Sequence, residues 1–347
     1  MDFKVSVICP SYNHSRYIAE MVESVMAQTL PVHELIVVDD GSTDDSLAKL
    51  KSFDYPNLRV QQNEENLGTY GTLNRALDMA QGDWIAVINS DDKWAPNKIE
   101  LQAFGLESTG LDWGFTLGAQ ITEEGEVRYV NQHGDWPREV SVDLLPYLFE
   151  ENRVLASSLV FRKGLIRFDE RLRYSGDWVG LMGLALHGSA NCCFELPPKE
   201  DYSGPAWTGR GVLYNVEPPQ IEQLTQWRQH TSNSYSRSKK QLAEEIRVRE
   251  TILANADALL SRTHNQVGGR FRLGRCALHL NALYLMAGRS AQARKALKSA
   301  NSYGITDNKR WVLSLMPRRI SAKYLSKVGI LSLEGLSTEP LDHLFPV

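Results

Sequence analysis

The sequence predicts an α/β protein whose first part is a mainly parallel sheet with helices on both faces, followed by a helical C-terminal region. Strand and helix patterns alternate over the first hundred residues. The expected strands are continuous apolar runs, as in sheets that are covered on both faces. From residue 236 onward almost every pattern is helical. We therefore expect two domains, at 1–235 and 236–347.

The first hundred residues contain four strands separated by three helices. Apolar residues such as Ile18 and Met21 lie at helical spacing after the first strand. Turn-forming residues at 39–42 end the second strand, and Gly82 and Asp83 precede the fourth. The expected strands are 3–9, 34–38, 58–61 and 84–88, and the expected helices are 16–29, 46–50 and 72–80.

The pattern is mixed between residues 111 and 235, which we interpret as the second half of the same domain, after a first half at 1–110. Strands are expected at 113–117, 127–130, 157–161 and 191–196, a helix at 177–187 and a long loop at 197–220. Later helices are expected at 241–261, 273–286, 290–302 and 311–328, with residues 287–289 joining two of them into a helical hairpin.

Composition excludes several classes of protein. The chain is 42% hydrophobic and 23% charged, as in globular proteins with a sizeable core. No apolar stretch approaches the ~20 residues that cross a bilayer. No signal-peptide pattern follows Met1, so we expect the chain in the cytoplasm. The four cysteines lack CxxC spacing, so we expect buried, reduced thiols rather than disulfides or a zinc cluster.

Charge is distributed unevenly. Residues 1–235 carry 19 Lys and Arg against 34 Asp and Glu, whereas residues 236–347 carry 19 against 8. The acidic part argues against nucleic acid as a partner, and the basic part favours an anionic surface such as phospholipid headgroups. The apolar run 311–316 beside basic residues at 318–327 suggests peripheral contact with the inner face of the cytoplasmic membrane. Alternatively, these apolar residues pack the helical tail against the catalytic domain or a second subunit.

Three polar clusters follow expected strands, at 10–13 (Pro-Ser-Tyr-Asn), 39–42 (Asp-Asp-Gly-Ser) and 89–92 (Asn-Ser-Asp-Asp). Because the carboxyl ends of parallel strands meet at one edge of a sheet, these side chains are expected to converge. Carboxylates placed there can bind a divalent cation or hydrogen-bond a nucleotide. Each cluster taken alone is also an ordinary turn.

Together with Asn66-Leu67-Gly68 and Asn74, these clusters resemble in order and spacing the motifs of the family 2 glycosyltransferases. The resemblance is strong over 3–110. It implies a GT-A fold and an inverting hexosyltransferase that uses a nucleotide-sugar, most commonly a UDP-sugar. It also implies a hydroxyl acceptor, as a glycan or lipid-linked sugar, in the biosynthesis of a bacterial cell-surface polysaccharide.

The resemblance also assigns roles to residues of the three clusters. Pro10, Tyr12 and Asp40 correspond to residues that hold the base and ribose. Asp91-Asp92 corresponds to the metal motif, in which Asp92 is expected to be the direct ligand of Mn²⁺ or Mg²⁺. Such an ion neutralises the charge of the diphosphate leaving group. The remaining residues of the implied donor site are Ser11, Asn13, Asn66, Gly68, Asn74 and Asp91.

Two later residues complete the implied site. Asp177, at the start of an apolar helix, corresponds to the general base that takes the acceptor proton. His230, in Trp-Arg-Gln-His, corresponds to a histidine close to the metal and diphosphate. The alternatives are an acid favoured by the helix dipole for Asp177 and a surface histidine for His230. The chain departs from the family at Gly176, where an acid is usual, and at Leu73, where an arginine is usual.

Two other functions are considered. A sugar nucleotidyltransferase would need a glycine-rich phosphate loop near the N-terminus, and residues 9–16 contain no glycine. A catalytically silent scaffold or binding protein would act through the helical tail. The presence of Asp40, Asp92 and Asp177 argues against this second alternative.

Overall fold

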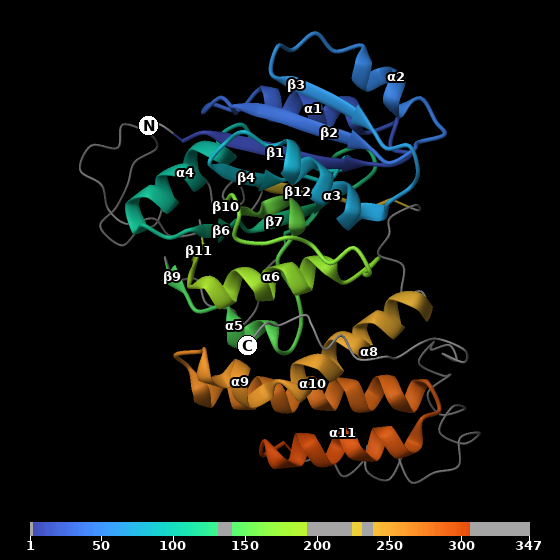
Figure 1. Cartoon of the computed structure of the whole chain (residues 1–347), viewed down its shortest axis with the longest axis vertical. Helices are drawn as coiled ribbons and strands as arrows, with labels where there is room; N and C mark the ends of the chain where they lie inside the picture. The colour runs from blue at the N-terminus through green and yellow to red at the C-terminus, as the bar shows by residue number, and fades with distance from the viewer. Residues whose placement is uncertain (1–2, 131–140, 193–223, 231–238, 306–347) are drawn as a thin grey trace. The chain divides into compact units, whose positions relative to one another are not determined.

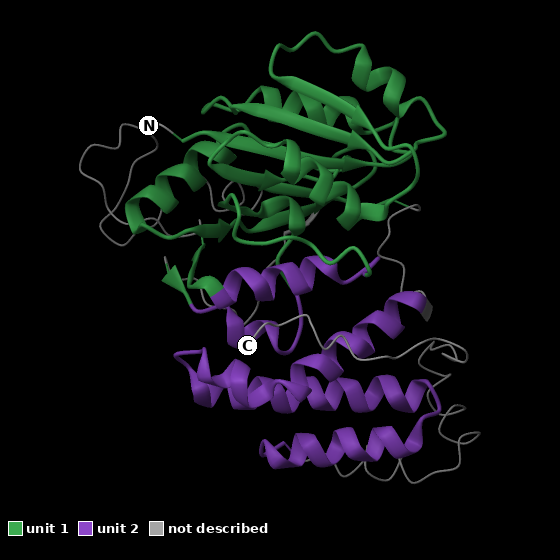
Figure 2. Cartoon of the chain, in the orientation of Figure 1, with its two compact units in different colours: residues 1–142, 153–171, 187–233 green, residues 143–152, 172–186, 234–347 purple. Residues whose placement is uncertain are grey.

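The computed structural model describes residues 3–130, 141–192, 224–230 and 239–305 (Figure 1). The chain divides into two compact units (Figure 2). Unit 1 comprises 1–142, 153–171 and 187–233, and unit 2 comprises 143–152, 172–186 and 234–347. The longest segment of unit 2 starts at residue 234, next to the predicted boundary at 235. Unit 2 also contains two shorter segments from the predicted first domain, 143–152 and 172–186. The functional roles of the predicted domains stay a prediction.

Unit 1 contains an eight-stranded sheet in the order β3-β2-β1-β4-β10-β6-β11-β9. Its first four strands are parallel, as predicted, and β10 and β9 run antiparallel to their neighbours. The chain passes from β1 outward to β2 and β3, and then returns to place β4 on the other side of β1. This reversal of strand order is where ligands bind in open α/β sheets. The strands are β1 (Val5–Ser11), β2 (Glu34–Asp39), β3 (Leu58–Gln62), β4 (Trp84–Val87), β6 (Trp113–Phe115), β9 (Ser141–Val142), β10 (Val160–Arg162) and β11 (Ala190–Cys192).

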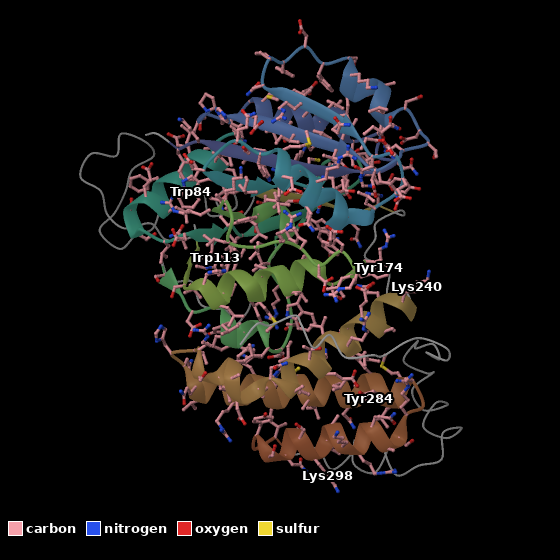
Figure 3. All side chains as sticks on the ribbon, viewed as in Figure 1. Trp84, Trp113, Tyr174, Lys240, Tyr284 and Lys298 are labelled. Atoms are coloured by element: carbon pink, nitrogen blue, oxygen red, sulfur yellow. The ribbon has the colours of Figure 1, made fainter. Side chains whose placement is uncertain are left out.

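Helices cover both faces of this sheet. The apolar side of α1 (Ile18–Met26) and part of α4 (Lys98–Thr109) pack with alternate residues of β1 and β2, such as Val7 and Val37, in one buried core. In Figure 1, α3 (Gly68–Met79) crosses in front of the parallel strands. Trp84, labelled in Figure 3, stacks on Phe3 with ring centroids 4.8 Å apart. The helix α2 (Ser46–Lys51) completes the predicted alternation.

Helix α4 was not predicted. All of its residues from Lys98 to Leu106 except Glu100 are buried. A helix that is buried all round has no apolar stripe, so the spacing that marks amphipathic helices is absent. The helix ends at Gly110, which has a φ of 66°.

A second, four-stranded sheet in unit 1 has the order β5-β12-β7-β8. Its strands are β5 (Lys93–Trp94), β7 (Gly118–Ile121), β8 (Val127–Val130) and β12 (Thr225–Arg228). Only β8 matches a predicted strand, and the predicted strand 113–117 is confined to β6. Because β12 pairs with both β5 and β7, residues 225–228 lie beside the segment that follows the third polar cluster.

The described part of unit 2 is helical. It contains α5 (Leu145–Leu148), α8 (Lys239–Ala254), α9 (Ala256–Ser261), α10 (Gln266–Met286), α11 (Ser290–Ser302) and most of α6 (Gly176–His187). The predicted hairpin is confirmed as α10 and α11, joined through Gly288 with a φ of 69°. Tyr284 and Ala293 share its buried core, and the buried Glu150 accepts hydrogen bonds from Arg272 and Arg275.

Several predicted features lie outside the described residues, among them the loop 197–220, the helix 311–328 and Cys193. The other three cysteines, Cys9, Cys192 and Cys276, are buried free thiols, as predicted. Among the helices that the structure describes, none has the length and apolar character needed to cross a membrane.

Candidate active site

The three polar clusters converge at the carboxyl edge of the parallel strands. Ser11 at the end of β1 pairs in register with Asp39 at the end of β2, and Ile8 pairs with Val87 of β4. The residues that follow these strands therefore leave the sheet at the same edge. The predicted convergence is confirmed for these three segments.

Reciprocal hydrogen bonds join the loops after β1 and β2. The backbone N–H of Asn13, a residue with a φ of 54°, donates to Ser42 Oγ at 2.9 Å, and the N–H of Thr43 donates to Asn13 Oδ1 at 2.8 Å. Beside them, Asp44 accepts from the N–H groups of Ser15 and Ser46. Burial raises the pKa of Asp44, but hydrogen bonds from the Ser46 side chain and from these N–H groups outweigh it and lower the pKa to about 2. The two hydrogen bonds of Asn13, to Ser42 and from Thr43, thus join the loop after β1 to the loop after β2.

Asp40 organises the start of α3. Its Oδ1 accepts from Asn63 Nδ2 and the N–H of Leu67, and its Oδ2 accepts from the N–H of Gly68, all at 2.8 Å. Asn66 Nδ2 donates to the Asp40 carbonyl at 3.0 Å. A carboxylate at a helix N-terminus satisfies N–H groups that have no partner within the helix. The structure therefore brings Asp40, Asn66 and Gly68 together, and their direct contact with a nucleotide stays a prediction.

An aromatic side chain projects beside this anchored loop. Tyr12 is 47% exposed, which is unusual for a large side chain at the end of a buried strand. Pro10 and Ser11 before it are buried. The Oγ of Ser11 and Oδ2 of Asp39 are buried and have no hydrogen-bond partner among the described residues. The exposed ring of Tyr12 offers a flat apolar surface of the kind that suits a nucleobase.

The two neighbouring acids of the third cluster have different surroundings. Asp92 is 2% exposed and accepts from Ser157 Oγ, from the N–H of Arg228 at 2.9 Å and from Asn89 Nδ2 at 3.4 Å. Burial, and after it the charge of Asp91, raise the pKa of Asp92 well above its ordinary value. Asp91 instead faces His230, whose Nε2 lies 3.0 Å from Asp91 Oδ2.

Three side chains with metal-binding atoms meet at this point: His14, Asp91 and His230. One donor atom from each lies within 4.8 Å of the others. Imidazole nitrogens and a carboxylate oxygen are ligands that first-row divalent ions accept, Mn²⁺ among them. The donor set therefore fits a divalent cation. Of the predicted site residues it contains His230 and Asp91 but not Asp92, and His14 was not predicted. The metal-binding roles of His230 and Asp92 stay predictions.

The side chain of Arg228 helps to hold this cluster in place. It is 1% exposed. Its Nε donates to the Asp91 carbonyl at 2.9 Å, its Nη1 donates to the carbonyls of Thr122 and Glu123, and its Nη2 pairs with Glu20. Arg228 therefore ties the main chain of Asp91 to the second sheet and to α1. It lies two residues before His230 in the sequence. The motif Trp-Arg-Gln-His at 227–230 contains Arg228, but the sequence alone does not predict the hydrogen-bond partners of this arginine.

The two remaining predicted residues have other surroundings. Asn74 is 2% exposed and clamps the segment after β10, because its amide bonds with the N–H and carbonyl of Phe168 and with Glu170. Asp177 belongs to unit 2, at the start of α6. Its carboxylate accepts from Asn152 Nδ2 at 3.0 Å and from the N–H of Trp178 at 2.8 Å. The roles of both residues in binding or catalysis stay predictions.

Comparison with known proteins identifies the first part of the chain. The family model described as Glycosyl transferase family 2 matches residues 6–160. These residues form a family 2 glycosyl transferase domain. The resemblance deduced from the three clusters is therefore confirmed. The family 2 domain includes β1 from Ser6 onward, all of β2 to β4, and two of the three side chains with metal-binding atoms, His14 and Asp91.

Two curated relatives resemble this domain. The putative teichuronic acid biosynthesis glycosyltransferase TuaG of Bacillus subtilis is 38% identical over 123 residues, which cover 35% of this chain and 49% of TuaG. The UDP-Glc:alpha-D-GlcNAc-diphosphoundecaprenol beta-1,3-glucosyltransferase WfgD of Escherichia coli is 41% identical over 101 residues, covering 29% of this chain and 40% of WfgD. The matched region thus spans less than half of either relative.

The solved structures extend the likeness in fold to almost the whole chain. The crystal structure of S. aureus TarS 1-349 in complex with UDP-GlcNAc has a TM-score of 0.57 at 21% identity, covering 93% of this chain and 92% of that one. The same protein without a named ligand has a TM-score of 0.55 at 20% identity. At this identity the likeness concerns the fold. The GT-A fold expected from the resemblance and the C-terminal helical region expected from the sequence pattern are both confirmed.

Proposed function

We propose that the protein is a metal-dependent, inverting glycosyltransferase that moves a sugar from a UDP-sugar to a hydroxyl acceptor in the synthesis of a bacterial cell-surface glycan. The observation that carries this proposal is the convergence of His14, Asp91 and His230 at the reversal of strand order in a family 2 domain. This is the point in the fold where a nucleotide diphosphate would be held.

The nucleotide half of the donor would lie against the loops after β1 and β2. Tyr12 offers its exposed ring to the base, next to the buried Ser11. Asn13 acts by fixing the loops after β1 and β2, and Asp40 acts by fixing the segment at the start of α3, because these segments hold the partners of their described hydrogen bonds. The complex of TarS with UDP-GlcNAc supports a UDP-sugar as the donor class.

The diphosphate half would lie at the metal-binding point. Asp91 and His230 would hold Mn²⁺ or Mg²⁺, and the bound ion would neutralise the diphosphate as it leaves. We place Asp91, and not Asp92, in direct contact, because the carboxylate of Asp92 already accepts from Ser157 and Arg228. Asp92 then serves to fix the turn that presents Asp91.

Asp177 would take the proton from the acceptor hydroxyl, which is then free to attack the anomeric carbon from the side opposite the diphosphate. The product would have the opposite anomeric configuration to the donor. The carboxylate of Asp177 is held in one orientation by Asn152 and by the backbone N–H of Trp178, and a general base must be oriented toward the proton that it takes. The names of TuaG and WfgD support a cell-wall or lipid-linked acceptor.

The proposal is tested first by binding. We expect UDP to raise the melting temperature of the full chain more in the presence of Mn²⁺ than in EDTA, by an amount set by the excess of ligand over Kd. ATP with Mn²⁺ serves as the control nucleotide. Equal shifts with UDP and ATP, or no shift with either, would contradict a UDP-sugar donor site.

The chemistry is tested with a panel of UDP-sugars and polyprenyl-diphosphate-linked sugar acceptors. We expect NMR of the product to show inversion at the anomeric carbon. Asp177→Asn should lower turnover by at least ~10²-fold, the low end for a general base, while UDP affinity stays unchanged. Asp169→Asn, which changes an acid of the other unit, is the control. Retention of configuration would refute the mechanism, and normal turnover would refute the role of Asp177.

A further inference from the structure

We infer that His14 is a third protein ligand of the divalent cation, so that the ion is held by two imidazoles and one carboxylate. This inference rests on the proposed function, since it concerns the same metal. The first observation is position: a ring nitrogen of His14 lies within 4.8 Å of the donor atoms of both Asp91 and His230. His14 follows β1, whereas His230 follows β12, so the two histidines reach this point from different sheets.

The second observation is that the ring of His14 is already oriented. Its Nδ1 lies 2.7 Å from the Oγ of Ser90, a buried residue next to Asp91. Metal-binding histidines usually bond one ring nitrogen to a neighbouring polar group, which fixes the ring and leaves the other nitrogen for the ion. With Nδ1 bonded to Ser90, Nε2 is the nitrogen left to bind the metal.

Further contacts fix the backbone and ring of His14. The N–H of His14 donates to Ser46 Oγ at 2.9 Å. The ring packs edge-on against His230, with centroids 5.4 Å apart and planes at 89°, and Tyr17 packs against both rings. Two imidazoles that approach edge to face within this distance can direct nitrogens to a common point. The ligand set is therefore assembled before any ion binds, which lowers the cost of binding one.

This ligand set has a consequence for the choice of ion. Mg²⁺ prefers oxygen ligands and keeps several waters, whereas first-row transition ions accept imidazole nitrogen readily. Two nitrogens and one carboxylate therefore favour Mn²⁺ over Mg²⁺. Three protein ligands also leave open positions at the ion, where oxygens of the diphosphate would bind.

The test is Mn²⁺ binding to the full chain without nucleotide, followed by electron paramagnetic resonance. We expect His14→Gln to weaken Mn²⁺ binding by at least ~10-fold, as removal of groups at a metal site commonly does. His33→Gln, which changes an exposed histidine of the same unit, should leave the affinity unchanged. Pulsed measurements should show nitrogen coupling from two imidazoles in the wild type and from one in His14→Gln.

The outcomes separate this inference from the proposed function. If the wild type binds Mn²⁺ and His14→Gln has the same affinity and the same nitrogen coupling, His14 is not a ligand, although the metal site stands. If the wild type does not bind Mn²⁺, the metal dependence proposed above fails as well. Should His14→Gln not fold, His230→Gln decides: bound Mn²⁺ must still show one imidazole, and its absence would overturn the inference.

Discussion

Replacement of Arg228 by methionine should destabilise unit 1 more than any change of a surface arginine. Methionine keeps an unbranched apolar stem, but it is two atoms shorter than arginine and cannot donate to the carbonyls of Asp91, Thr122 and Glu123. Glu20 is affected less, because it is 42% exposed and also pairs with Lys93. Each buried acceptor left without a donor costs about 1–3 kcal/mol.

Because water can reach some of these carbonyls after the change, we expect a total loss of about 3–5 kcal/mol, the lower part of the sum for three such acceptors. For a unit of this size, that loss lowers the melting temperature by roughly 10 °C. Circular dichroism melts and urea titrations measure it. The control is Arg167→Met, because Arg167 and its partner Asp78 are both more than half exposed and such pairs contribute little. Equal melting temperatures for the two variants would refute the reasoning.

Three further predictions concern other parts of the chain. Asp91→Asn should abolish the Mn²⁺-dependent part of the UDP-induced thermal shift while the fold stays intact, whereas Asp92→Asn should lower the melting temperature without ligand, since Asp92 accepts from Ser157 and Arg228. The pKa of Asp44 is lowered to about 2, so its stabilising effect is complete above its unfolded pKa near 4 and is lost as the pH falls toward 2. The urea midpoints of wild type and Asp44→Asn should therefore differ at pH 6 and converge near pH 2, with Asp45→Asn as the control. Finally, anionic vesicles at low salt should float the intact chain but not a chain that ends at Asn308, if the basic residues at 318–327 bind headgroups at about 1 kcal/mol each. Flotation of neither chain would contradict membrane contact.

Much of unit 1 could be predicted because its first strands are local and continuous. The runs that became β1, β2 and β4 are buried on both faces, so each appears in the sequence as an unbroken apolar segment ended by turn residues. The helices between them cover the sheet with one face and keep their apolar spacing. The edge where the three clusters meet follows from the parallel order alone.

The second sheet could not be predicted in the same way. β5 contains two residues and β12 contains four, and they pair with each other although some 130 positions separate them. Neither is long enough to show a period of two. The two residues of β12 that pair with β5, Thr225 and Gln226, are also polar, so their partners, and not their own pattern, make them a strand.

The same limit explains why the sequence could not say which of two neighbouring acids faces His230. Adjacent carboxylates in a turn point in different directions, and the direction of each depends on which donors surround it. For Asp92 those donors are Ser157 and the N–H of Arg228, which lies 136 positions along the chain. Both groups come from segments that follow the cluster, and they leave Asp91 to face His230. Local motifs therefore locate the site, but contacts made by the distant β12 determine which side chain the site presents.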